Sequence, residues 1–186
     1  MQLSTVAKGG RIHLKKAEKS DYGDYLRWSK SRESIGEFQL FLPNVSDEIV
    51  ITALDEILKD DKREMFMIQK NDSNKNVGWI DCILPERVPF VVQIGFTIGE
   101  VKERGNGFAQ ETVMLILGYL FSKQDTNRVQ ATTDVQNFAS QKVLTRNGFK
   151  REGKLTGYYK TSEGFRDHSI FGITRSMWEK LRQVTV

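Results

Sequence analysis

The sequence predicts one mixed α/β domain of the α+β type, with helices covering a central sheet that is mostly antiparallel. Its 186 residues are a length typical of one domain. No internal repeat and no linker rich in Gly, Ser or Pro divides the chain, so we expect residues 1–186 to form a single domain. The periods of its apolar residues predict the order β-α-α-β-β-β-α-β-α-β-β. Consecutive strands with short polar connections are typical of an antiparallel meander.

The N-terminal third predicts a strand and two helices. Residues 11–17 alternate apolar and polar side chains, which is the period of a strand. Ser20-Asp21 and, further on, Ser46 are of the types that cap helices, and each precedes apolar residues at helical spacing. An irregular stretch over 34–44 separates the two helices.

The rest of the chain predicts three strands, a long helix, a strand, a short helix and a final pair of strands. From Asn106 the apolar period changes from that of a strand to that of a helix of about four to five turns. The short helix is expected from about 138 to Asn147-Gly148, and Thr161 to Gly164 form a turn between the last two strands. The strands are expected at 64–70, 76–84, 91–98, 128–133, 153–160 and 167–175.

The composition excludes several classes of protein. Eleven Phe, three Trp and five Tyr supply a core that a disordered chain lacks, and a lone cysteine, Cys82, forms no intrachain disulfide. No apolar run approaches the ~20 residues that span a bilayer, and the first residues lack the apolar stretch of a signal peptide, so a cytoplasmic protein is expected. A net charge of +4, spread along the chain, favours anions such as nucleotides, phosphorylated cofactors or RNA without selecting one.

Residues 104–110, Arg-Gly-Asn-Gly-Phe-Ala-Gln, are the most informative segment. They lie at the start of the long helix, where free amide N–H groups and the helix dipole attract anions. Gly105 and Gly107 let the backbone approach phosphate oxygens closely, and Arg104 can donate a charge-assisted hydrogen bond to the same anion. The segment lacks the Gly-Lys-Ser/Thr of a P-loop, and Gln110 stands where the dinucleotide fingerprint has Gly or Ala. By themselves, these glycines are also compatible with a purely structural turn.

Several segments resemble the GNAT acetyltransferase superfamily. Arg104-Gly105-Asn106-Gly107-Phe108-Ala109 matches its R/Q-x-x-G-x-G/A signature, and Asn137-Phe138-Ala139-Ser140 with Asn147-Gly148-Phe149 resembles its next motif. Other pieces resemble the branch of ribosomal-protein N-terminal acetyltransferases: Arg11-Ile12-His13-Leu14, Glu152-Gly153-Lys154-Leu155, Gly164-Phe165-Arg166-Asp167 and Trp178. The resemblance covers about residues 11–178 in the family's order.

The resemblance implies direct transfer of an acetyl group from acetyl-CoA to a primary amine within a ternary complex. It implies a sheet that splays between the strand ending near Ile98 and the strand 128–133, so that the pantetheine arm pairs with the first of them. The cofactor-binding residues that it implies are Phe96, Thr97, Ile98, Arg104, Gly105, Asn106, Gly107, Phe108, Ala109, Asn137, Ser140 and Lys142. For Lys142, as for Arg146, a solvated helix surface is the alternative.

The resemblance gives a candidate for the catalytic acid but none for the base. Ser140 occupies the family's position near the thioester sulfur, so it is the candidate proton donor to the CoA thiolate, with a first-turn helix residue as the alternative. Tyr159 is a second candidate, as a donor or as an organiser of water, against the role of a packed aromatic. Gln93 and Tyr159 stand where relatives often carry Glu. Asp81, Glu33, Glu37 and water stay open as the base.

The first helix and the loop after it are implied to wall the acceptor cleft, with Trp28, Glu37, Phe38 and Phe41, beside Leu40, as substrate-binding residues. Aromatic rings and a carboxylate suit a cationic amine, although packing within an irregular loop is the alternative. His168 either orients a group in this cleft or has a structural role. The chain has no His/Cys cluster that predicts a metal.

A protein or peptide α-amine is the first expected acceptor, and a small-molecule amine is the second. Two other classes stay open at this point. Gln93 in place of a Glu is compatible with a CoA-binding module that has no catalytic activity. The net positive charge is compatible with an RNA- or ribosome-associated protein. The sequence leaves open whether the chain is a monomer or a homodimer.

Overall fold

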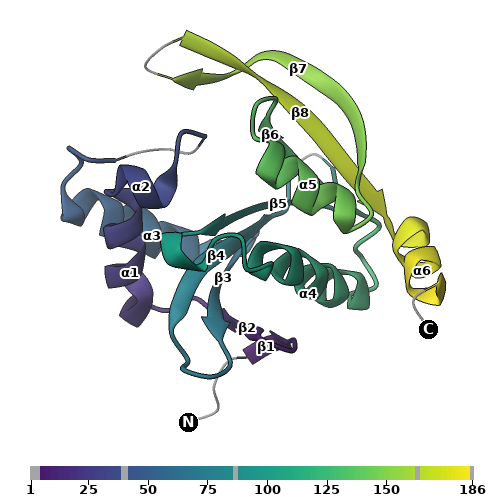
Figure 1. The fold of residues 1–186 in the computed structure, drawn as a ribbon, viewed down its shortest axis with the longest axis horizontal. Coiled ribbons are helices and arrows are strands. Elements are labelled where there is room, and N and C mark those ends of the chain that lie inside the picture. The colour runs from purple at the N-terminus through teal and green to yellow at the C-terminus, as the bar shows by residue number, and fades with distance from the viewer. Residues whose placement is uncertain (1–4, 39–41, 86–87, 162–163, 185–186) are drawn as a thin grey trace.

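A sheet with the strand order β1-β2-β3-β4-β5-β6-β8-β7 is the frame of the computed structural model, which describes residues 5–38, 42–85, 88–161 and 164–184 (Figure 1). Neighbouring strands run antiparallel, except for the parallel pair β5 and β6. The mostly antiparallel mixed sheet that the sequence predicts is therefore confirmed. The strands are β1 (Thr5–Lys8), β2 (Ile12–Lys16), β3 (Arg63–Lys70), β4 (Asn76–Ile83), β5 (Val91–Ile98), β6 (Arg128–Asp134), β7 (Lys150–Thr161) and β8 (Gly164–Thr174).

Helices cover both faces of the central strands, because those strands are apolar on both sides. In β3, Phe66 and Ile68 pack into a core with α4, whereas Met65 and Met67 point the other way, into a second core with α1 and α3. This alternation follows from the two-residue period of a strand. The helices are α1 (Tyr22–Ser29), α2 (Arg32–Ile35), α3 (Asp47–Lys59), α4 (Phe108–Ser122), α5 (Phe138–Arg146) and α6 (Arg175–Val184).

Three elements were not predicted from the sequence: β1, α2 and α6. The strand β1 and the helix α2 have four residues each, too few to establish a period. The helix α6 begins at Arg175, directly after the last residue of β8, so no Gly or Pro separates the two elements.

The two predicted helix caps differ in outcome. At the start of α3, the Ser46 hydroxyl oxygen accepts from the Ile49 amide at 3.4 Å, which confirms that cap. The prediction from Ser20-Asp21 is confirmed in position, because Asp21 is the N-cap residue of α1, but the Asp21 carboxylate makes no cap hydrogen bond to that helix. Asp21 instead accepts from the Glu18 amide at 2.9 Å and pairs with Lys15, closing a single turn before α1.

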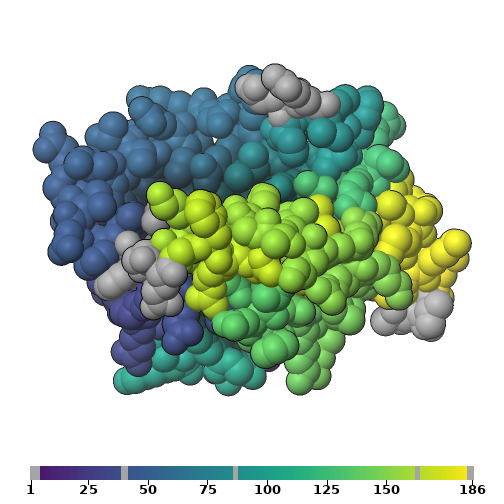
Figure 2. Space-filling model, turned by 90° about the horizontal axis from the view of Figure 1, so that it is seen from above, coloured from purple at the N-terminus to yellow at the C-terminus, as the bar shows by residue number. Residues whose placement is uncertain are grey.

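The parallel strands β5 and β6 separate near the first residues of α4 and α5, and the sheet is open there. Their ladder joins only Val91–Gln93 to Arg128–Gln130, although β5 continues to Ile98 and β6 to Asp134. The two strands therefore diverge toward their C-terminal ends, as the resemblance implied. Figure 2 shows the β7–β8 hairpin, in yellow-green, lying across the molecule between the N-terminal helices and α6. None of the described helices is long and apolar enough to span a membrane.

Candidate functional site

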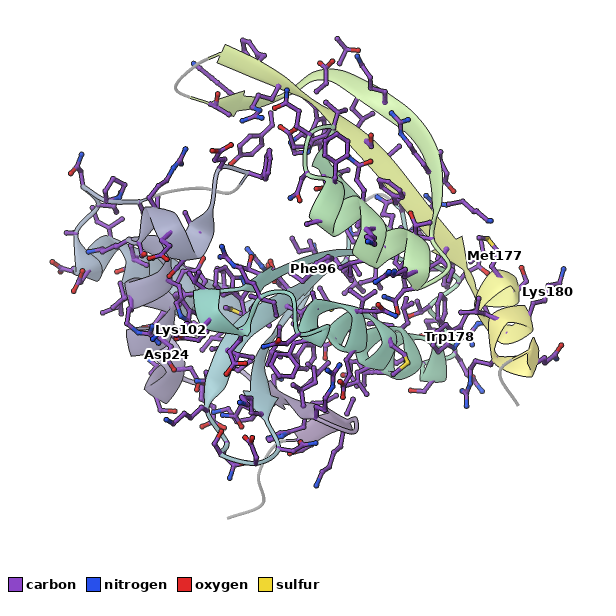
Figure 3. All side chains as sticks on the ribbon, in the orientation of Figure 1. Asp24, Phe96, Lys102, Met177, Trp178 and Lys180 are labelled. Carbon is purple, nitrogen blue, oxygen red and sulfur yellow. The ribbon has the colours of Figure 1, made fainter. Side chains whose placement is uncertain are left out.

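Two cavities meet where β5 and β6 diverge. The larger, which we call the groove, has a volume of about 480 Å³ and runs between the N-terminal ends of α4 and α5. The smaller, which we call the inner cavity, has a volume of about 240 Å³ and lies among β4, β5, β6 and β8. Figure 3 labels Phe96, which lies between the central strands and α5. The residues that line both cavities are Phe38, Phe96, Thr97, Asn137 and Ser140.

The loop before α4 presents unpaired amides to the groove. Gly105 and Gly107 have φ angles of 80° and 81°, a region of backbone conformation that favours glycine. Within the described part of the chain, no group accepts a hydrogen bond from the amides of 105–109, and the first helical bond at this end runs from the Glu111 amide to the Gly107 carbonyl. This end of α4 can therefore bind an anion through its main chain.

Two arginines hold this loop in place. Arg104 lines the groove, but its guanidinium donates to the carbonyl oxygens of Ile98 at 2.9 Å, Glu33 at 3.0 Å and Ser34. Arg104 therefore joins the loop to β5 and α2, and its predicted contact with the anion stays a prediction.

Arg11 is a loop contact that the sequence did not assign to the site. Its Nε donates to Glu111 at 2.9 Å, another of its N–H groups donates to the Asn106 carbonyl, and its guanidinium lies over the Phe108 ring at 5.2 Å. Asn106 itself does not line either cavity, whereas Phe108 and Ala109 line the groove. Arg11 opens one of the motifs that carried the resemblance, but the sequence does not reveal that it pairs with a glutamate 100 residues away.

The start of α5 forms the opposite wall of the groove. The Asn137 side-chain oxygen accepts from the Ser140 amide at 3.1 Å and so caps the helix. The Ser140 hydroxyl has no hydrogen-bond partner among the described residues, and it lies where the groove meets the inner cavity. Lys142 and Arg146 line the groove without an ion-pair partner in the part of the chain that the structure describes. The groove therefore combines free amides on one side with cations on the other.

Aromatic rings and polar side chains both line the inner cavity, and its two carboxylates are paired with arginines. Asp81 accepts from Arg63 Nε at 2.8 Å, and Asp134 pairs with Arg166 Nε at 2.7 Å. Asp81, one of the candidates for the base, therefore has its negative charge balanced by the guanidinium of Arg63. The other candidates lie elsewhere, since Glu37 lines the groove, Glu33 lines neither cavity, and Gln93 accepts from Gln130 at the end of the β5–β6 ladder.

His168 lines the inner cavity, and Tyr159 does not. His168 is 8% exposed, and burial lowers its pKa below the ordinary 6.5, with Asp134 opposing the shift and Arg166 adding to it. Tyr159 stacks on the His168 ring with the centroids 5.5 Å apart. Tyr159 therefore contacts His168 and lines neither cavity, which does not favour its predicted direct role as a donor.

The predicted acceptor wall is found in part. Glu37 lines the groove and Phe38 lines both cavities, with Arg166 over the Phe38 ring at 5.2 Å. The prediction for Trp28 is wrong, because this side chain is fully buried and stacks behind Trp79, whose own ring faces the inner cavity. Phe41, like Leu40, lies outside the described residues.

Comparisons with known proteins agree with this geometry. Residues 11–150 match the family model of the acetyltransferase (GNAT) domain. An uncharacterised N-acetyltransferase, p20, of Bacillus licheniformis is 24% identical over 126 residues, which are 68% of this chain and 70% of that protein.

Two solved structures share the fold. A spermidine N-acetyltransferase from Vibrio cholerae, in complex with CoA and spermine, has a TM-score of 0.78 at 17% identity, over 90% of this chain and 98% of that one. A ribosomal L7/L12 α-N-protein acetyltransferase in complex with CoA has a TM-score of 0.79 at 16% identity, over 93% and 98%. The family match covers most of the chain, and the fold agrees with it. The chain therefore belongs to the GNAT acetyltransferase family and is an acetyl-CoA-dependent acetyltransferase.

Proposed function

We propose that the groove binds acetyl-CoA and that the inner cavity binds a primary amine, to which the acetyl group is transferred directly. The observation that carries this proposal is that Asn137 and Ser140 line both cavities. A thioester at their junction is within reach of an amine in the inner cavity. Because a thioester is already activated, holding the two reactants side by side supplies much of the rate.

The groove offers matching partners for the parts of acetyl-CoA. The amides of 105–109 would bind the diphosphate, as unpaired N–H groups at a helix start do. Lys142 and Arg146, exposed on α5, would add charge to the phosphates. Phe96, Thr97 and Ile98 line the groove along β5, where the pantetheine arm would lie.

Ser140 is the proposed proton donor to the departing thiolate. Its hydroxyl has no partner among the described residues, and its amide is held by Asn137 at 3.1 Å. Capping therefore fixes the position of Ser140 without occupying its side chain. A hydroxyl at the junction of the two cavities is placed to give its proton to sulfur as the C–S bond breaks.

The inner cavity favours the α-amine of a peptide or protein over a polyamine. Its volume of about 240 Å³ suits the end of a chain rather than a long molecule. Asp81 and Asp134 are paired with Arg63 and Arg166, so they offer little charge to a multiply charged amine. The rings of Phe38, Trp79 and Phe96 can instead pack against the first side chain and a single ammonium group.

Mass spectrometry after incubation with isotope-labelled acetyl-CoA tests this function. The panel contains peptides with a free N-terminus, the same peptides with a blocked N-terminus and an internal lysine, and spermidine. We expect label on the α-amine of the free peptides and much less on the other two. Label on spermidine alone would instead support the small-molecule alternative. Release of CoA without an acetylated amine, or binding without turnover, would overturn amine transfer as the function.

A further inference from the structure

The two ring nitrogens of His168 differ in their exposure, and neither has a hydrogen-bond partner among the described residues. Nδ1 is sealed from solvent and has no hydrogen-bond partner among the described residues. Nε2 is not sealed in this way and has no partner in the same part of the chain, while the residue lines the inner cavity. Because His168 lines the inner cavity and only Nδ1 is sealed, we infer that Nε2 is the ring nitrogen that a molecule in this cavity can reach.

The surroundings fix the orientation of this ring. Tyr159 stacks on it with the centroids 5.5 Å apart, and Tyr158 packs at a tilt with the centroids 5.3 Å apart. On the neighbouring strand β6, Asp134 is the residue directly opposite in the ladder. The ladder fixes the backbone of His168 and the two tyrosine rings pack against the imidazole, which restricts its position as an acid–base role requires.

The charges around the ring leave it neutral near pH 7. Arg166 on β8 and Asp134 on β6 act on His168 in opposite directions, and they are paired with each other at 2.7 Å. Asp81, across the inner cavity on β4, is paired with Arg63. Burial is the largest influence, and it lowers the pKa of His168. A neutral imidazole can accept a proton, whereas an imidazolium cannot.

We propose that His168 is the general base that accepts a proton at Nε2 from the acceptor ammonium; this inference rests on the proposed function of the inner cavity as the acceptor site. The ammonium loses one proton to Nε2, and the neutral amine forms the N–C bond to the acetyl carbonyl as the C–S bond breaks. The second amine proton accounts for the proton that the thiolate gains through Ser140. The imidazolium then returns its proton to solvent, which balances the reaction.

A histidine base also fits the proposed acceptor class. An α-ammonium has a pKa of about 8, whereas a lysine-type ammonium has one of about 10.4. Transfer of a proton to an imidazole therefore costs much less free energy from an α-ammonium than from a lysine-type ammonium. The chemistry of the base and the size of the inner cavity favour the same acceptor.

His168→Gln tests the proposal through its pH profile on the best peptide of the panel. We expect kcat/KM at pH 7 to fall about 100-fold or more, which is typical for the loss of a general base. The ratio of the wild-type kcat/KM to that of the variant should fall by about tenfold per pH unit up to about pH 8. The reason is that the variant depends on amine that has lost its proton in solution. A variant within about threefold of the wild type, with the same pH profile, would overturn the proposal.

His13→Gln is the matched control, because it makes the same exchange in the only other histidine of the chain. His13 is held by Asn71 at 2.9 Å and Gln69 at 3.0 Å and lines neither cavity. Its kcat/KM should stay within about threefold of the wild type. Calorimetric binding of CoA and thermal unfolding show whether each variant is folded and loads its co-substrate.

Imidazole ¹⁵N NMR on the unmodified protein tests the same group without turnover or a His168 variant. The two histidines are assigned by the signals that His13→Gln removes. We expect His168 to carry its hydrogen on Nδ1 near pH 7.5, and the Nε2 signal to shift when a free-N-terminus peptide is added without acetyl-CoA. Hydrogen on Nε2, or no shift at saturating peptide, would overturn the role of His168. A wild type without turnover on any amine would overturn the proposed function instead.

Discussion

At the scale of single residues, the side chains of Ser140 and His168 line the inner cavity and have polar atoms without a hydrogen-bond partner among the described residues. Buried or half-buried polar atoms usually have a hydrogen-bond partner, because a buried donor or acceptor without one costs about 1–3 kcal/mol of folding free energy. The nearby carboxylates follow this rule, since Asp81 and Asp134 are paired with arginines. The Ser140 hydroxyl and the His168 ring differ from these carboxylates, because they are free to bind the reacting molecules that we propose for the two cavities.

Ser140→Ala should lower kcat by about tenfold or more, because the thiolate then leaves without a positioned donor. KM for acetyl-CoA should change little, since the Ser140 amide and its bond to Asn137 remain. Release of free thiol, followed with a chromogenic reagent at saturating peptide, measures both constants.

Thr145→Ala is the control for Ser140→Ala on the same helix. The Thr145 hydroxyl donates to the Gln141 carbonyl at 2.8 Å, and the residue is exposed and lines neither cavity. Its turnover should match the wild type. A folded Ser140→Ala protein with unchanged kcat would remove Ser140 from the mechanism.

At the scale of elements, the site depends on two helices that begin at the same opening of the sheet. The helix α4 presents the free amides of 105–109, and α5 presents Asn137, Ser140 and the cations of the groove. The glycines and the helix start in the sequence predict the first of these correctly. The role of Arg104 was not predictable, because its partners lie in α2 and β5 and depend on how those elements pack.

Gly105→Ala should weaken acetyl-CoA binding through both the backbone and the groove. At φ 80° an alanine costs about 1–2 kcal/mol of folding free energy. The added Cβ meets no protein atom within 4 Å and lies beside the amides of the groove. We expect the Kd of CoA, measured by calorimetry, to rise by about tenfold or more, as loss of a hydrogen bond to a charged group predicts.

Gly157→Ala separates the effect on the groove from the effect on the backbone. Gly157 also has a positive φ, 58°, but lies on β7 and lines neither cavity. It should lose stability by a comparable amount while its Kd for CoA stays that of the wild type. Equal Kd values for the two variants would argue against the loop as the diphosphate site.

At the scale of the whole molecule, the sheet consists of two parts joined by the short ladder between β5 and β6. Periodicity in the sequence predicts most strands and helices of both parts, because period is a local property of the chain. Contacts between distant segments were not predictable, because they depend on the register of the strands. Arg11 on Glu111, Trp28 behind Trp79, and His168 facing the inner cavity are all of this kind.

The stability of the whole fold should depend on pH through the same buried imidazole. Burial lowers the pKa of His168 below 6.5, so the unfolded chain takes up a proton at a higher pH than the folded one. Below about pH 6.5 the unfolded state therefore binds more protons, and the free energy of unfolding falls as the pH falls through that window. Urea midpoints at pH 7.5 and pH 5.5 should show this loss in the wild type, and His168→Gln should reduce it.

Glu152→Gln provides the control for this pH window. Arg128 holds the pKa of Glu152 below its ordinary 4.5, so the stability that this carboxylate contributes is lost only below that pH. The variant should keep the wild-type difference between pH 7.5 and pH 5.5, because Glu152 is ionised at both. If His168→Gln and Glu152→Gln both kept the wild-type difference, the imidazole would not be neutral and buried in the folded protein. The same result would remove the physical basis for His168 as a proton acceptor.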